Sequence, residues 1–133
     1  MLTRDELLKI ARARLRDAEV LSRSRRYDGA IYLCGYAVEI KLKARICKTL
    51  HWNGYPATKK EFQDYQSFRT YKLEVLLRLS GVESKIKSNF LTEWSVVTKW
   101  DPSARYEPIS NVSKQDAAEL MIESAKTLLG VLL

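Results

Sequence analysis

The most informative segment of the chain is Ala30-Ile-Tyr-Leu-Cys-Gly-Tyr-Ala-Val-Glu-Ile-Lys-Leu-Lys-Ala-Arg-Ile-Cys-Lys-Thr-Leu50. Apolar residues surround most of this segment for its first three turns, a pattern typical of a helix buried on nearly all sides. We therefore predict a central helix over residues 30–50, with Asp28 and Gly29 as its cap. Glu39 lies inside the apolar region, where a carboxylate needs a partner, and Lys43, four residues on, is the nearest candidate.

Helical patterns lie on both sides of this segment. Upstream, Thr3 and Glu6 form a capping box, and apolar residues then recur at helical spacing to about Arg25. Downstream, Ser113 with Asp116 three residues later signals a last helix. Between them, Asn, Gly and Pro indicate a loop at 51–59, followed by a short or irregular helix and two further helices over 61–68, 71–79 and 83–100.

These elements predict one all-α domain over residues 1–133. Short connections favour antiparallel neighbours, so we expect an up-and-down helical bundle of four longer helices with one or two short ones. The composition agrees, because 46% hydrophobic residues exclude general disorder and only 5 Gly and 3 Pro argue against a turn-rich all-β fold.

The positive charge is concentrated in the first half of the chain. The net charge of +7 divides into +6 over residues 1–50, +3 over 51–100 and −2 over the remainder. A basic field attracts polyanions such as RNA, nucleotides or an acidic partner, although a well-solvated arginine-rich surface would produce the same balance. The predicted members of a polyanion-binding surface are Arg12, Arg16, Arg23, Lys41 and Lys48.

The chain shows no sign of export, membrane insertion or metal binding. Its first residues are charged, which does not fit a secretory signal, and no apolar run approaches the roughly 20 residues of a membrane span. Cys34 and Cys47 would lie about 20 Å apart on one helix, so we expect reduced thiols and a cytoplasmic protein. With a single His and no close Cys pair, we predict no metal and no cofactor.

Three parts of the chain resemble the HEPN (higher eukaryotes and prokaryotes nucleotide-binding) family. The stretch from Arg26 to Ala44 resembles its core helix pair, with matches at Ala30, Gly35, Tyr36, Ala37, Glu39, Leu42, Lys43 and Ala44. The segment Thr70-Tyr-Lys-Leu-Glu-Val-Leu-Leu77 is similar to the family's stretch around His-x-Leu-x-x-Leu. Trp100 followed by Arg105-Tyr106 resembles the Trp and Arg-Tyr that precede the last helix of the family.

The resemblance implies an all-α bundle that usually forms a homodimer. It also implies a setting with RNA or nucleotides, in a toxin–antitoxin or defence system or beside a minimal nucleotidyltransferase. Our leading hypothesis is a non-catalytic or weakly catalytic nucleotide- or RNA-associated module. The alternatives are a metal-independent endoribonuclease toxin and a purely structural dimerisation domain.

The nuclease alternative depends on Arg45 and His51, because family nucleases use an Arg and a His four to six residues apart. A His can act as general base on the RNA 2′-hydroxyl, and an Arg can stabilise the charge on a phosphorane. The structural alternative is that both residues interact with the last carbonyls of the helix.

The motif residues Glu39 and Lys43 also allow two interpretations. They can line a pocket in which Lys43 meets a phosphate, with Tyr36, Arg105 and Tyr106 nearby. Alternatively, Glu39 pairs with a buried Arg such as Arg105 and holds the loop before the last helix. The aromatic side chains present the same choice between base stacking and core or dimer packing: Tyr32, Tyr36, Trp52, Tyr55, Trp94, Trp100 and Tyr106.

Overall fold

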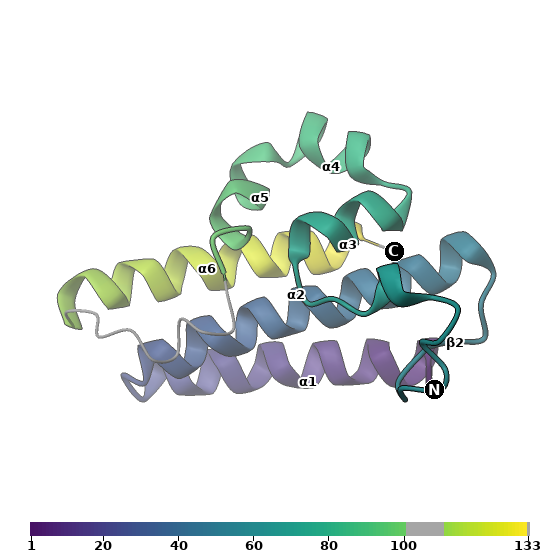
Figure 1. The fold of residues 1–133 in the computed structure, drawn as a ribbon. Coiled ribbons are helices and arrows are strands. Elements are labelled where there is room, and N and C mark those ends of the chain that lie inside the picture. Colours follow the sequence, from purple (N-terminus) through teal and green to yellow (C-terminus); the bar gives the residue numbers. More distant parts are fainter. Residues whose placement is uncertain (101–110, 133) are drawn as a thin grey trace.

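Three long helices form the body of the molecule (Figure 1). The computed structural model describes residues 1–100 and 111–132, and of residues 111–113 only the backbone. Within these ranges α1 (Arg4–Arg23), α2 (Tyr27–Leu50) and α6 (Asn111–Val131) pack against one another. The shorter helices α3 (Leu73–Ser80), α4 (Glu83–Asn89) and α5 (Leu91–Val97) cover the other side, with α3 on α2 and α5 on α6. The predicted all-α helical bundle is confirmed.

The turn between α1 and α2 differs from the expected cap. Helix α2 begins at Tyr27, so Asp28 and Gly29 lie in its first turn rather than before it. The reversal is made by Arg25, which adopts a left-handed backbone with φ 62°. Lys114 of α6 donates to the Asp28 carboxylate at 2.6 Å, so the acidic first turn joins α2 to α6 as well as complementing the helix dipole.

The start of α1 follows its sequence signal and adds a short strand pair. Thr3 and Glu6 form the capping box, each side chain accepting from the other residue's backbone N–H. Just before it, β1 (Leu2–Thr3) pairs antiparallel with β2 (Gly54–Tyr55), a contact that no sequence signal predicted. A Cβ at Gly54 would lie 2.6 Å from the Leu2 carbonyl oxygen, so this approach of the two backbones requires glycine.

The segment expected as one helix over 83–100 is two helices that meet at Phe90. The backbone leaves helical geometry there, at φ −134° and ψ 32°. Ser88 and Asn89 are weak helix formers, and the half-buried Phe90 ring packs against the core, so packing decides the direction of the chain. Between β2 and α3, the helical structure is limited to a 3₁₀ turn, η1 (Gln66–Phe68). Helix α3 ends at Gly81, as predicted, with φ 80°.

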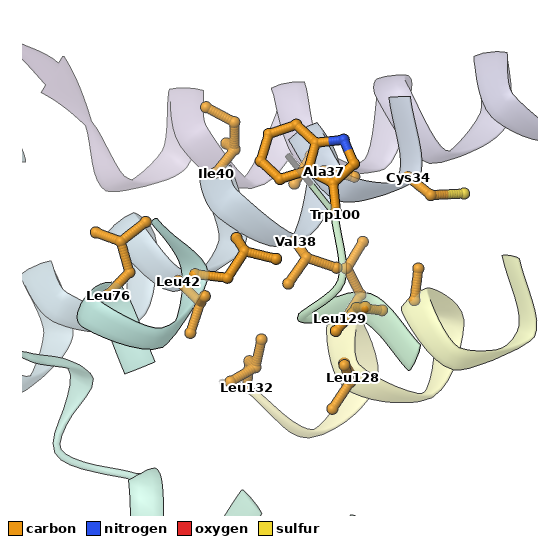
Figure 2. Close-up of a cluster of buried hydrophobic side chains, with 14 of the residues drawn as sticks. Cys34, Ala37, Val38, Ile40, Leu42, Leu76, Trp100, Leu128, Leu129 and Leu132 are labelled. Atoms are coloured by element: carbon orange, nitrogen blue, oxygen red, sulfur yellow. The ribbon is translucent and has the colours of Figure 1, made fainter. Parts of the chain in front are cut away.

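Side chains of α2 occupy the centre of the core (Figure 2). Val38 and Leu42 of α2 lie among Leu128 of α6, Leu132 just after α6 and Leu76 of α3, and all five have no exposed surface. Complete burial stabilises each such side chain by about 1.5–3 kcal/mol. Cys34 and Cys47 are free and buried as expected, and burial, with a smaller contribution from Glu19, raises the pKa of Cys34 to about 12.

The described residues contain neither a candidate membrane span nor a cluster of metal ligands. None of the described helices has the length and apolar character needed to cross a bilayer. In the same part of the chain, no three His, Cys, Asp or Glu side chains gather in an arrangement that could hold a metal ion.

Candidate functional site

Basic side chains form stripes on both α1 and α2. Arg12, Arg16 and Arg23 are exposed and share one face of α1, because their spacings of four and seven residues return to the same side of a helix. On α2, Lys41, Arg45 and Lys48 share a face for the same reason. Arg12 lies near enough to Lys41 to lower its pKa, so the two stripes approach each other at these residues, where α1 packs on α2. We call these six residues the basic face.

The inner part of the basic face is buried, which the sequence did not predict for Lys41. Lys41 is only 6% exposed, because the packing of the helices covers its aliphatic stem. Burial first, and the nearby Arg12 second, lower the pKa of Lys41. The Nε of Arg45 is also buried and has no hydrogen-bond partner in the described part of the chain.

No carboxylate within the described residues pairs with Arg12, Lys41 or Arg45. Arg14 on the same helix differs, because its Nε lies 3.2 Å from the Asp17 carboxylate. Unpaired positive charge in a partly dehydrated seam is costly, so such a seam favours an incoming anion. The basic face can therefore bind phosphate or carboxylate oxygens.

Glu39 and Lys43 form a compensated pair on the opposite side of α2, half a turn away from Lys41, Arg45 and Lys48. The Lys43 ammonium donates to the Glu39 carboxylate at 2.9 Å, which confirms the partner expected from the spacing. The same ammonium lies 5.4 Å from the centre of the Tyr55 ring, and the Tyr55 hydroxyl donates to the Phe68 carbonyl at 2.6 Å. The pair thus connects α2 to the segment around β2.

Burial dominates the electrostatics of this pair. The Glu39 side chain is 9% exposed, and burial raises the pKa of its carboxyl although Lys43 acts in the opposite direction. The half-buried Tyr36 lies close enough to sense this carboxylate, and its pKa is raised by burial first and by Glu39 second. Arg105 and Tyr106, which the sequence placed in the same site, lie outside the described residues.

Arg45 and His51 occupy different surroundings. His51 ends α2 with left-handed backbone angles, φ 56° and ψ 37°, and its backbone N–H bonds to carbonyls of the last turn. Its exposed side chain lines a cavity of about 440 Å³ that Arg45 does not line. Among the described residues, the cavity at His51 is therefore not one that the two side chains share.

The His51 cavity is the feature that sequence reasoning missed. Its wall includes Trp52 and Tyr65, which pack edge-on with ring centres 5.2 Å apart. The available signal was a run of aromatic residues through a segment interpreted as loop and irregular helix: Trp52, Tyr55, Phe62, Tyr65 and Phe68. Trp94 and Trp100, by contrast, are core residues at 2% and 9% exposure.

The sequence was compared with protein families, curated proteins and solved structures. One family model, described as HEPN domain, matches residues 5–133. Comparisons with curated proteins and with solved structures gave no match.

Proposed function

Because this chain belongs to the HEPN domain family, we propose that it is a non-catalytic or weakly catalytic module that binds RNA through the basic face. Family membership supports a nucleotide- or RNA-associated role, and the geometry of α1 and α2 supports RNA as the ligand. The proposal includes a homodimer and a partnership with a minimal nucleotidyltransferase, in a toxin–antitoxin or defence setting.

The observation that carries the proposal is the unpaired positive charge in the seam between α1 and α2. Lys41 and the Nε of Arg45 are buried, and Arg12 lies near enough to Lys41 to lower its pKa, while the described residues provide no carboxylate to any of the three. A phosphate would supply the missing negative charge. The α1 stripe then extends from Arg12 to Arg23, about 16 Å along the helix, which is enough for more than one phosphate of a strand.

The test is RNA binding as a function of salt. Fluorescence anisotropy with a labelled single-stranded RNA should give an affinity that falls steeply with salt concentration. In a plot of the logarithm of the binding constant against the logarithm of the salt concentration, each phosphate that the protein neutralises should add about 0.7 to the steepness of the slope. Arg12→Ala and Lys41→Met should each weaken binding and reduce the slope. Arg78→Ala, an exposed cation on α3, is the matched control and should change neither. Binding without salt dependence, or an equal effect of the control, would overturn the proposal.

The weakly catalytic side of the proposal rests on Arg45 and His51. Their separate surroundings in one protomer favour binding over cleavage. Incubation of the protein with RNA in the presence of a chelator tests this directly. Formation of cyclic phosphate ends that disappears in His51→Ala would instead establish the metal-independent ribonuclease.

The partner proposal can be tested apart from RNA binding. A neighbouring reading frame that encodes a small nucleotidyltransferase would supply the candidate. Co-purification of the two chains at a fixed ratio is the expected result, and separate elution of the two chains at micromolar concentration would contradict it.

A further inference from the structure

We infer that the cavity at the end of α2 is a stacking pocket for one unpaired base of the RNA strand. We call it the aromatic cavity, and it measures about 440 Å³, with a lining of Met1, His51, Trp52, Asn53, Gly54, Pro56, Glu61 and Tyr65. As a site for an RNA base, it rests on the function proposed above. The aromatic cavity would add a contact to a base, whereas the basic face contacts only phosphates.

The ring wall of the cavity is held rigidly before any ligand arrives. Trp52 packs against Phe68 with ring centres 4.9 Å apart and against Tyr55 at 6.3 Å. Tyr55 is itself 1% exposed and anchored by the hydrogen bond of its hydroxyl to the Phe68 carbonyl. A preformed wall loses little conformational entropy when a planar ligand stacks on it.

Tyr65 provides the open ring surface. It packs on Trp52 and Phe68 at one side, yet remains 45% exposed, although large apolar surfaces are usually covered in a folded domain. An exposed aromatic ring on a rigid support is the arrangement that single-stranded nucleic-acid binding proteins use to stack bases.

Polar groups at the cavity suit the edge of a base. The side chains of His51 and Asn53 have no hydrogen-bond partner among the described residues, and both carry a donor and an acceptor. The Glu61 carboxylate accepts from the Thr58 backbone N–H at 3.1 Å and pairs with the Met1 amino group at 2.9 Å. These contacts, the amino group first, lower the pKa of Glu61, so the cavity holds an ionised acceptor at neutral pH.

Backbone strain supports a role for His51. A left-handed backbone at a residue other than glycine costs about 1–2 kcal/mol, and such residues cluster at functional sites. His51 carries this strain at the position that places its ring at the cavity. Asn and Gly tolerate the left-handed backbone region better than His. A turn made two or three residues later, at Asn53 or Gly54, would therefore have cost less.

Positive charge connects the cavity to the basic face. Lys48, a member of that face, lies one turn before His51, and the exposed Lys59 and Lys60 directly precede Glu61. A strand that follows the basic face can therefore keep its phosphates near lysines while one base turns into the cavity. An apolar peptide side chain would contact the same rings, but it would leave His51 and Asn53 without partners among the described residues.

The experiment compares an intact RNA with a strand that contains abasic positions. Tyr65→Ala should weaken anisotropy-measured binding of the intact RNA about tenfold, a factor within the range that stacking on one aromatic side chain contributes. It should leave the affinity for a fully abasic strand unchanged. Asn53→Ala, an exposed position, should show the same pattern more weakly. Tyr71→Ala is the control, because Tyr71 is 51% exposed and lies outside the cavity.

A second probe separates this inference from the proposed function. Free adenosine should change the fluorescence of Trp52 in the wild type, and Tyr65→Ala should abolish the change. Salt-dependent RNA binding that is insensitive to Tyr65→Ala, Asn53→Ala and base removal would overturn the base pocket alone. No RNA binding with a retained adenosine response would overturn the RNA function and keep a nucleobase pocket. Loss of both signals would overturn both.

Discussion

Gly35 shows how one residue explains part of a motif. A Cβ at this position would lie 2.1 Å from the indole of Trp100, so the ring packs directly on the backbone of α2 (Figure 2). Tyr32 closes the contact, with its ring centre 6.1 Å from that of Trp100. Gly35 and Trp100 belong to two separate motifs of the sequence, and the structure brings these two motifs into contact.

Gly35→Ala should therefore destabilise the protein although alanine is the better helix former. We expect a loss of about 2–3 kcal/mol in the free energy of unfolding, because the new methyl group displaces a buried indole. Denaturant unfolding measures it. Gly130→Ala on α6 is the control, since its Cβ would meet nothing within 4 Å. That substitution should stabilise the protein by about 0.5–1 kcal/mol, and equal effects of the two variants would contradict the packing argument.

Glu39 should titrate above an ordinary glutamate. Burial raises its folded-state pKa above 4.5, so folding favours the protonated carboxyl, and stability decreases as pH rises from the unfolded pKa through the folded one. NMR titration of the side-chain carboxyl measures the pKa. Lys43→Met should raise that pKa further and cost about 2–3 kcal/mol at pH 7, because it leaves a buried charge unpaired.

The control for this prediction is Glu39→Gln, which removes the titrating group. The decrease in stability through that pH window should disappear in this variant. An unchanged pH profile would show that the decrease comes from another residue.

At the scale of elements, Glu74 joins three short helices. Its carboxylate on α3 pairs with Lys87 of α4 and accepts from the Trp94 indole N–H at 3.0 Å and from the Thr98 hydroxyl at 3.4 Å. The hydrogen bond from Lys87 is the largest cause that lowers the pKa of Glu74. Because α3, α4 and α5 each have only 7–8 residues, such contacts matter more here than along the long helices.

Glu74→Gln should therefore cost about 1 kcal/mol at pH 7, a modest value because the side chain is 44% exposed. The folded-state pKa is depressed, so the stabilisation is present above pH 4.5 and is lost as pH falls through the lower folded value. Thermal unfolding at pH 7 and at pH 2–3 measures the difference, which should vanish in acid. Glu93→Gln on α5 is the matched control, and a pH-independent difference would contradict the assignment.

For the whole molecule, the expected homodimer requires an apolar surface that one protomer leaves uncovered. Val20 on α1 and Leu120 on α6 are 52% and 54% exposed, on helices that pack together. Light scattering coupled to size exclusion should give twice the chain mass of 15.4 kDa. Leu120→Lys should shift the mass toward the monomer, whereas Leu91→Lys on α5 should not. A wild-type monomer at all concentrations would contradict the dimer.

Periodicity and short-range signals predicted most of the fold. The central helix, the α1 capping box and the Gly81 stop depend on neighbours within a few residues, which the sequence displays directly. The sequence did not predict the break at Phe90 or the β1–β2 pair, because each depends on packing between segments that are distant in the sequence. The Glu39–Lys43 pair could be predicted from one helical turn, whereas the burial of Lys41 could not.

Residue types at local spacings were enough to predict the all-α class, the buried character of α2 and the family. The packing of distant segments was needed to show which cations have no carboxylate partner among the described residues and which aromatic residues line a cavity. Spacing places side chains on faces of one helix, but the packing of α1, α2 and the segment after His51 determines which faces meet. The chemistry of a site depends on which faces pack together, because the burial of a side chain and the charges around it are fixed only by that packing.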